Sequence, residues 1–307
     1  MNQHLSHMTI AGARKYDYPP VFTRLSPWWE DYKVLNDYFA RLSLVLSQGE
    51  QMNDILVLEP TTTIWLYYSY VMNDPRCMEI GSAFQRVVLG GEALEGFVSQ
   101  GFDDHTKLFF PAAGAAFTPP EVTDEGINWG DGVRPATRDY TPLYDAGRHE
   151  LAYDFFIHDG GIASSWALAA KTGDKLVIGG PRGSLVVPED YAWQLYVGDE
   201  SGMPALRRRL LGLQQLPTRP QVTAIVTIGD ESYQDYLTDL DGFHIEWVVG
   251  HNPAAVAERL AQVVVPANDY FIWLTGEGAA VKSLLARFEG EEIDPQLVRS
   301  QAYWHNK

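Results

Sequence analysis

The feature that most constrains the fold of this chain is a change of pattern near residue 190. Before it, short alternating apolar segments such as 84–89 are separated by turn residues. After it, strand-like apolar runs alternate with helical ones. The first pattern predicts a small antiparallel β-barrel, and the second predicts an open, mostly parallel α/β sheet. We therefore expect a β domain over residues 76–190, followed by an α/β domain over residues 191–307.

The periodicity also predicts individual elements within the two domains. The β domain carries one helix at Ala163–Ala170, and residues 112–135 form a long surface loop, because they contain Pro, Gly, Asp and Glu without any period. The strands expected in the β domain are 84–89, 107–111, 137–144, 150–157 and 174–179. The α/β domain is expected to contain strands 194–197, 222–227, 244–249 and 270–274, and helices 204–213, 253–263 and 279–288.

Residues 1–75 differ from the rest and are expected to form an extra N-terminal segment of helix and strand. Trp28–Ser47 has apolar residues at three- and four-residue steps and ends near Gly49, which predicts an amphipathic helix. Residues 54–60 form an apolar strand ended by a proline, and an aromatic segment follows at 65–70. This segment is too small to bury its aromatic side chains alone.

Composition excludes several classes of function. The chain has 307 residues and a net charge of −17, which disfavours nucleic acid and anionic membranes as partners. The single cysteine, Cys77, rules out an internal disulfide, an all-cysteine zinc site and an iron–sulfur cluster. The sequence shows neither a signal peptide nor an apolar run of about 20 residues. We therefore expect a cytoplasmic protein that does not enter membranes, of unknown oligomeric state.

A first candidate site for a phosphate-bearing cofactor lies in the β domain. On a strand, Arg138 and Tyr140 project from the same face, and Thr141 follows them. Arginine binds pyrophosphate, and tyrosine can lie along a flat ring system with its hydroxyl as a polar group. Gly161 precedes the expected helix, and a helix N-terminus binds anions. The combination favours FAD, although each motif alone is better explained as a surface charge, a barrel residue or a turn.

A second candidate site lies where the pattern changes. A strand ends near Gly198, is followed by Asp199, Glu200 and Ser201, and leads into a helix, as in the first βα turn of a nucleotide-binding sheet. The segment around Glu277 follows a later strand, and ligands bind at the carboxyl ends of such strands. A nicotinamide nucleotide would suit this site. Arg207–Arg209 are either a partner for the 2′-phosphate of NADPH or a solvated helix face.

Six motifs occur together in a fixed order, and at these residues the chain resembles the siderophore-interacting proteins, a family of FAD-dependent ferric-siderophore reductases. The motifs lie at residues 137–142, 154–158, 163–167, 181–184, 198–201 and 303–304. The resemblance covers about residues 78–307. It implies a six-stranded FAD-binding barrel followed by an NADPH-binding α/β domain. The motif positions that it assigns to cofactor binding also include Asp139, Asp154, His158, Ala163, Ser164, Trp166, Arg182 and Trp304.

The resemblance also implies a reaction and a substrate. NADPH would reduce the flavin, and the flavin would pass single electrons to Fe(III) in a ferric siderophore or other ferric chelate, releasing Fe(II) inside the cell. Hard oxygen ligands hold Fe(II) more weakly than Fe(III). Because such chelates are often anionic and the chain is acidic, a local cation near the flavin would help. Lys107 and Arg182 are the candidates for substrate binding.

Residues 1–75 depart from that family and resemble a fragment of α-L-rhamnosidase-like glycoside hydrolases. The similar segments are 11–16, 26–29, 38–43, 46–49 and 56–60. The fragment is far short of a catalytic barrel, so it implies no hydrolase activity. Two alternatives to the reductase remain: a carbohydrate-binding or glycosidase-derived module, and a flavin-binding scaffold without turnover.

Overall fold

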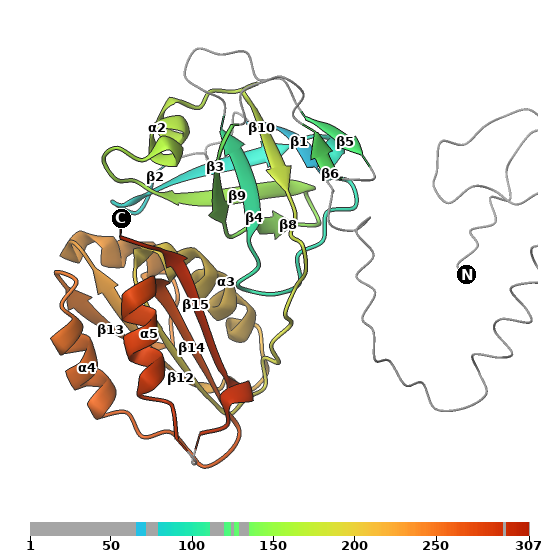
Figure 1. Ribbon diagram of the computed structural model, residues 1–307. Coiled ribbons are helices and arrows are strands. Elements are labelled where there is room, and N and C mark those ends of the chain that lie inside the picture. The colour runs from blue at the N-terminus through green and yellow to red at the C-terminus, as the bar shows by residue number, and fades with distance from the viewer. Residues whose placement is uncertain are drawn as a thin grey trace, which may run out of the picture. The chain divides into compact units, whose positions relative to one another are not determined.

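The fold is described by a computed structural model of residues 1–307, which is shown in Figure 1. The structure describes residues 66–71, 79–110, 120–123, 126–128, 135–290 and 293–306. All of them lie within one compact unit, Glu59–Lys307. The helix predicted at 28–47 and the strand predicted at 54–60 lie outside the described residues.

The first half of this unit is a curved antiparallel sheet with one helix, which we call the β domain. Its strand order is β7-β4-β10-β1-β3-β9-β8, and β2 pairs with β3. The bounds are β1 Leu66–Val71, β2 Glu79–Ile80, β3 Phe84–Gly90, β4 Thr106–Phe110, β7 Ala136–Tyr140, β8 Leu143–Asp145, β9 Glu150–Phe156 and β10 Lys175–Gly179. The antiparallel β domain predicted from the sequence is confirmed. The expected loop at 112–135 contains a short hairpin of β5 (Glu121–Thr123) and β6 (Gly126–Asn128).

Strand β1 differs from the sequence-based expectation. The segment 65–70 was placed in the N-terminal segment, but β1 pairs with β10 along Leu66–Tyr70 and with β3 at Tyr70 and Val71. It therefore belongs to the β domain. An aromatic run shows that a segment is a good strand, but the partner of a strand is set by distant residues, so the local pattern could not assign it.

The core of the β domain lies between the sheet and helix α2 (Ile162–Ala169). Leu89, Leu108 and Phe155 are fully buried and come from three different strands. Trp166 on α2 packs against the rings of Phe110 and Phe155, at centroid distances of 5.7 and 5.9 Å. The predicted helix at 163–170 is thus present and anchored by its aromatic face.

The second half of the unit is a five-stranded parallel sheet with helices on both faces, the α/β domain. Its order is β13-β12-β11-β14-β15, and every neighbouring pair is parallel. The bounds are β11 Trp193–Gly198, α3 Met203–Gln214, β12 Gln221–Ile228, β13 His244–Val249, α4 Pro253–Ala261, β14 Tyr270–Glu277, α5 Gly278–Ala286 and β15 Val298–Trp304. The order reverses between β11 and β14, and such a switch point is where open sheets bind ligands.

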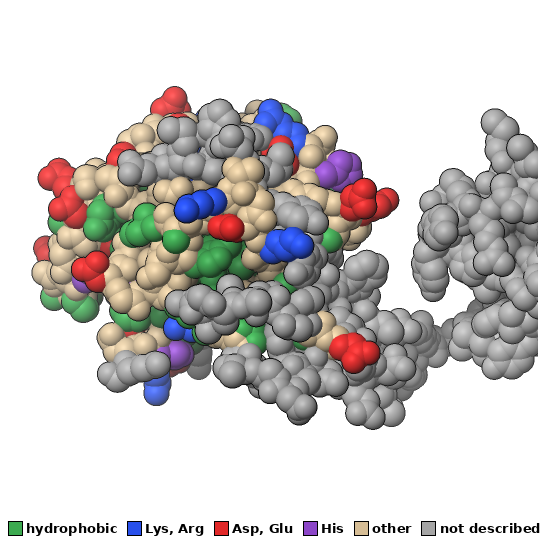
Figure 2. Space-filling view, turned by 90° about the horizontal axis from the view of Figure 1, so that it is seen from above, with side chains coloured by type: hydrophobic (Ala, Val, Ile, Leu, Met, Phe, Trp, Pro, Cys, Tyr) green, Lys and Arg blue, Asp and Glu red, His purple; other side chains and the backbone are tan. Residues whose placement is uncertain are grey.

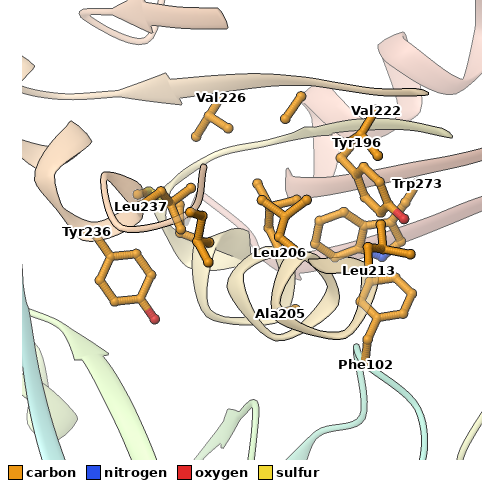
Figure 3. Close-up of a cluster of buried hydrophobic side chains, with 14 of the residues drawn as sticks. Phe102, Tyr196, Ala205, Leu206, Leu213, Val222, Val226, Tyr236, Leu237 and Trp273 are labelled. Carbon is orange, nitrogen blue, oxygen red and sulfur yellow. The ribbon is translucent and has the colours of Figure 1, made fainter. Parts of the chain in front are cut away.

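Two apolar clusters cover the two faces of this sheet. One contains α3 through Leu206, Leu210 and Leu213, and the other contains α4 through Val256 and Leu260. Figure 3 shows the first cluster, with the ring of Phe102 entering it from a loop of the β domain. The two domains therefore share part of one core.

Polar contacts also join the two domains. Asp103, in the loop before β4, accepts hydrogen bonds from Arg299 Nε on β15 (2.5 Å) and from Trp273 Nε1 on β14 (3.2 Å). Arg208 on α3 donates to the carbonyl oxygens of Ser99 (2.6 Å) and Pro142 (3.1 Å). These contacts link the two domains, and the carboxyl ends of the parallel strands face the β domain, as Figure 1 shows.

None of the helices in the described ranges is long and apolar enough to cross a membrane.

Candidate functional site

A cavity of about 550 Å³ lies where the β domain faces the carboxyl ends of the parallel strands. It brings together most of the residues predicted for the two cofactor sites. The predicted residues that line it are Arg138, Asp139, Tyr140, Thr141, Asp154, His158, Asp199, Glu200, Ser201 and Trp304. The two sites inferred separately from the sequence thus form a single continuous space.

Strand β7 forms the wall of the cavity in the β domain. Tyr140 is half-buried against Phe155, with ring centroids 4.6 Å apart. Burial raises the pKa of its hydroxyl to about 12, although the nearby Arg138 opposes the shift. Arg138 is exposed, donates to the carbonyl oxygen of Thr137, and forms no ion pair with any carboxylate in the described ranges. A neutral phenol therefore stands beside an arginine that has no acidic partner among the described residues.

The turn from β9 into α2 forms a second part of the wall. Gly161 is the N-cap of α2, and no side chain caps the first turn. A Cβ at Gly161 would lie 2.6 Å from Cε1 of His158, so only glycine permits this approach. Ser164 is buried; its hydroxyl donates to the Phe156 carbonyl and accepts from the His158 N–H. The buried serine fixes the backbone that places His158 at the cavity.

Asp154 lines the cavity, but protein groups already surround its carboxylate. The guanidinium of Arg86 donates to both of its oxygens at 2.6 Å. The hydroxyl of Tyr236, from the α/β domain, donates to one of them at 2.6 Å. Burial raises the pKa of Tyr236 well above its ordinary value, so this hydroxyl keeps its proton. Asp154 therefore joins the two domains directly beside the cavity.

The turn after β11 supplies the opposite wall. Asp199 caps the short helix η3 (Glu200–Gly202) by accepting from the N–H (3.0 Å) and the hydroxyl of Ser201. Its other oxygen accepts from the indole N–H of Trp304 at 2.8 Å. A Cβ at Gly276 would lie 2.7 Å from this carboxylate. The end of β15 is thereby fixed to the turn that follows β11.

Glu200 and His251 form a pair at the edge of the cavity. Oε1 of Glu200 accepts from the backbone N–H of Gly229 at 2.6 Å and lies 3.2 Å from Nε2 of His251. Burial raises the pKa of Glu200, and the backbone donors and His251 oppose that shift. The segments that follow three neighbouring strands come together at this carboxylate. Glu200 comes after β11, Gly229 after β12 and His251 after β13.

Several predicted cofactor residues do not line the cavity. Ala163 and Trp166 pack in the core of the β domain, while Gly161 and Ser164 shape the backbone beside His158. Glu277 is the N-cap of α5 and accepts from the N–H groups of Ala279 and Ala280, which lowers its pKa. At Gly198, a Cβ would lie 2.8 Å from the Thr275 methyl group, which indicates a packing role.

The arginine run at 207–209 does not reach the cavity. All three guanidinium groups are engaged in and around the domain interface, so the interpretation of this run as a solvated helix face is also wrong. Arg209 is fully buried, and burial lowers the pKa of Arg208. Their partners are the Asp239 carboxylate and Tyr236 carbonyl for Arg207, Ser99 and Pro142 for Arg208, and Tyr196, Gln194, Val187 and Pro188 for Arg209.

The two candidate substrate residues lie outside the cavity wall. Lys107 is paired with Asp139 across β4 and β7, with Nζ 2.8 Å from Oδ1 and the lysine side chain 42% exposed. Arg182 is exposed and forms no ion pair within the described residues. On the face seen in Figure 2, described acidic and basic side chains are scattered and do not form one charged patch.

The sequence analysis missed several residues that line the cavity. They are Phe84, His105, Phe156, Pro204, His251, Gln301, Ala302 and Tyr303, although Phe156 and Tyr303 belong to quoted motifs. Lone histidines carry no spacing signal. Gln301 and Ala302 of β15 were missed because this strand was not predicted at all. Its apolar residues are few, and it forms at the sheet edge by pairing with β14.

Comparison with solved structures identifies the class of fold. A ferredoxin–NADP+ reductase from Plasmodium falciparum aligns with a TM-score of 0.55 and 14% identity, over 78% of this chain and 96% of that protein. A siderophore utilization protein from T. fusca aligns with a TM-score of 0.67 and 29% identity, over 78% of this chain and 92% of that one. The chain has the two-domain fold of the ferredoxin–NADP+ reductases, and the predicted fold class is confirmed.

Comparison of sequences identifies the family. The model of the siderophore-interacting FAD-binding domain matches residues 75–185, and the model of the siderophore-interacting protein matches residues 191–307. The NADPH-dependent ferric-chelate reductase of Escherichia coli (strain K12) is 63% identical over 249 residues, which are 78% of this chain and 98% of that protein. The chain belongs to the siderophore-interacting protein family, as its motifs predicted.

Proposed function

We propose that this chain is an FAD-containing reductase that takes electrons from NADPH and delivers them to iron in ferric siderophores or other ferric chelates. The observation that carries the proposal is the single cavity between the β domain and the carboxyl ends of the parallel strands. A flavin and a nicotinamide must meet in one space for hydride transfer, and this cavity supplies that space. The 63% identical relative is named as an NADPH-dependent ferric-chelate reductase.

The residues of the β domain fit FAD. Arg138, which has no acidic partner among the described residues, offers its guanidinium to the pyrophosphate, and the neutral ring of Tyr140 offers a flat apolar surface beside it. Gly161 leaves the first turn of α2 uncapped, so its N–H groups are available to an anion. When bound, the flavin supplies the chemistry that links a two-electron donor to one-electron acceptors.

The turn after β11 fits the nucleotide. Helix α3 begins there, and no side chain caps its first turn. Asp199 accepts hydrogen bonds from Ser201 and from Trp304. These bonds fix the position of the Trp304 side chain relative to the turn after β11. Substrate capture is assigned to Arg182 and Lys107. Among the described residues Arg182 forms no ion pair, whereas the charge of Lys107 is offset by Asp139. Since NADPH is an intracellular reductant, the proposal sets iron release in the cytoplasm.

A steady-state assay tests the proposed reaction. FAD-loaded protein is supplied with NADPH and an anionic ferric chelate, and Fe(II) is trapped by a colour-forming ligand. Each NADPH donates two electrons and each Fe(III) accepts one, so two Fe(II) must form per NADPH oxidised, with release of one proton. NADPH oxidation that produces no Fe(II) contradicts the proposal, and so does Fe(II) formation in the absence of FAD. Flavin that stays bound without any turnover supports the scaffold alternative.

A charge variant tests the substrate assignment separately. Arg182→Gln should lower kcat/KM for an anionic chelate while leaving reduction of an uncharged acceptor unchanged. Arg148→Gln is the matched control, because Arg148 is exposed and pairs with Asp145 in a turn that does not line the cavity. An equal loss with both acceptors would mean that Arg182 contacts the flavin and not the chelate.

A further inference from the structure

NADPH differs from NADH by one phosphate, and the chain must recognise that group with some cation. The run Arg207–Arg209 was the obvious source, but all three guanidinium groups are engaged in and around the domain interface. Within the described residues, no lysine or arginine of the α/β domain lines the cavity. The one side chain on that wall that can carry a positive charge is His251.

Three properties distinguish His251 from an ordinary surface histidine. It lies two residues after the end of β13, past Gly250, at the carboxyl edge of the sheet, where nucleotides bind. Its backbone has φ 50°, a left-handed conformation that is uncommon for a residue other than glycine and that recurs at ligand-binding positions. Its Nε2 lies 3.2 Å from the Glu200 carboxylate, which is 5% exposed, while the imidazole itself is 51% exposed.

The buried carboxylate of Glu200 orients the imidazole of His251. Glu200 is held in place by the N–H of Gly229, so the carboxylate cannot turn away from His251. One imidazole nitrogen therefore faces protein, and half of the side chain remains open toward the cavity. A protonated imidazole in this position donates one hydrogen bond inward to Glu200 and offers the other outward to an anion.

We propose that His251, oriented by Glu200, is a residue that binds a phosphate of the nicotinamide nucleotide. This inference rests on the proposed function and assigns one of its nucleotide-binding residues. The 2′-phosphate and the bridging diphosphate share the chemistry that an imidazolium recognises, and the experiment below separates them. Without His251, the carboxylates of Asp199 and Glu200 leave the wall acidic and repel either group.

Calorimetric titration of the FAD-loaded protein with 2′,5′-ADP and with ADP tests the assignment. His251→Asn removes the charge but tolerates left-handed backbone. It should weaken binding about 10- to 100-fold, as expected for a lost hydrogen bond to a charged group. Loss restricted to 2′,5′-ADP identifies the 2′-phosphate, and loss restricted to ADP identifies the diphosphate. His244→Asn is the matched control, because His244 begins β13, the strand that precedes His251, and also pairs with a glutamate, Glu246, at 3.0 Å, but outside the cavity.

A permanent cation at the same position completes the test. His251→Arg should bind the same nucleotide with about the affinity of the wild type, because its guanidinium group supplies a positive charge at this position. Unchanged affinity in His251→Asn, with its flavin spectrum intact, overturns the inference and leaves the reductase proposal standing. A wild-type protein that binds neither nucleotide and is not reduced by NADPH overturns the reductase proposal, and the inference with it.

Discussion

Asp103 is expected to be the most sensitive polar contact between the two domains, and Asp103→Asn tests this. Its side chain is 1% exposed and accepts hydrogen bonds from Arg299 Nε at 2.5 Å and Trp273 Nε1 at 3.2 Å. Breaking a buried charge pair costs about 3–5 kcal/mol. Because the Arg299 side chain is 24% exposed, water can rehydrate part of its guanidinium group, so we expect about 2–3 kcal/mol.

Calorimetric melting of the FAD-loaded protein provides the measurement. In a protein of this size, 1 kcal/mol shifts Tm by about 2–4 °C, so Asp103→Asn should lower Tm by roughly 4–12 °C. A double-mutant cycle with Arg299→Met isolates the pair and should give a coupling energy above about 1 kcal/mol. The exposed pair Asp145 and Arg148, at 3.7 Å, is the control, with an expected coupling below about 0.5 kcal/mol. Equal coupling in the two cycles would refute the argument from burial.

Three further predictions concern the cavity. Gly161→Ala should raise the FAD dissociation constant roughly tenfold in titrations, because the new Cβ displaces the ring of His158. Gly183→Ala is the control: its new Cβ has no atom within 4 Å, so the FAD dissociation constant should not change. The pKa of Tyr140 is raised to about 12, so its contribution to stability is complete below pH 10 and is lost as the pH rises toward 12. Tyr140→Phe should therefore make the free energy of unfolding depend less on pH between pH 10 and pH 12. Asp154→Asn should lower the free energy of unfolding by about 2–4 kcal/mol in urea titrations, because it weakens both hydrogen bonds from its arginine partner.

The sequence predicted the parts of the fold that depend on local pattern. Strands β11 to β14 and the helices between them follow apolar runs of the correct length and period, and their order implied a parallel sheet. Strand β15 was not predicted, because its residues alternate weakly and the strand exists through pairing with β14. The segment of strand β1 was identified only as aromatic and was assigned to residues 1–75, because its pairing with β10 could not be inferred from a local pattern.

The same distinction applies to the site. Arg138, Tyr140 and Asp199 were found because each belongs to a motif with a fixed local geometry, a strand face or a βα turn. His251 was not found, because its role depends on Glu200, 51 residues earlier in the chain, and on the meeting of three strand ends. Asp154 was predicted to contact the cofactor from its motif alone. Its two hydrogen-bond partners are Arg86 from the β domain and Tyr236 from the α/β domain, and only the folded chain brings them to Asp154.

The most direct test of the account is the visible absorption spectrum of the purified protein under anaerobic conditions. The account predicts oxidised-flavin bands that bleach when NADPH is added and return when a ferric chelate is added, with two Fe(II) formed per flavin reoxidised. A protein that remains colourless after incubation with FAD, or flavin bands that NADPH does not bleach, would contradict the assignment of the cavity between the two domains as the site where both cofactors meet.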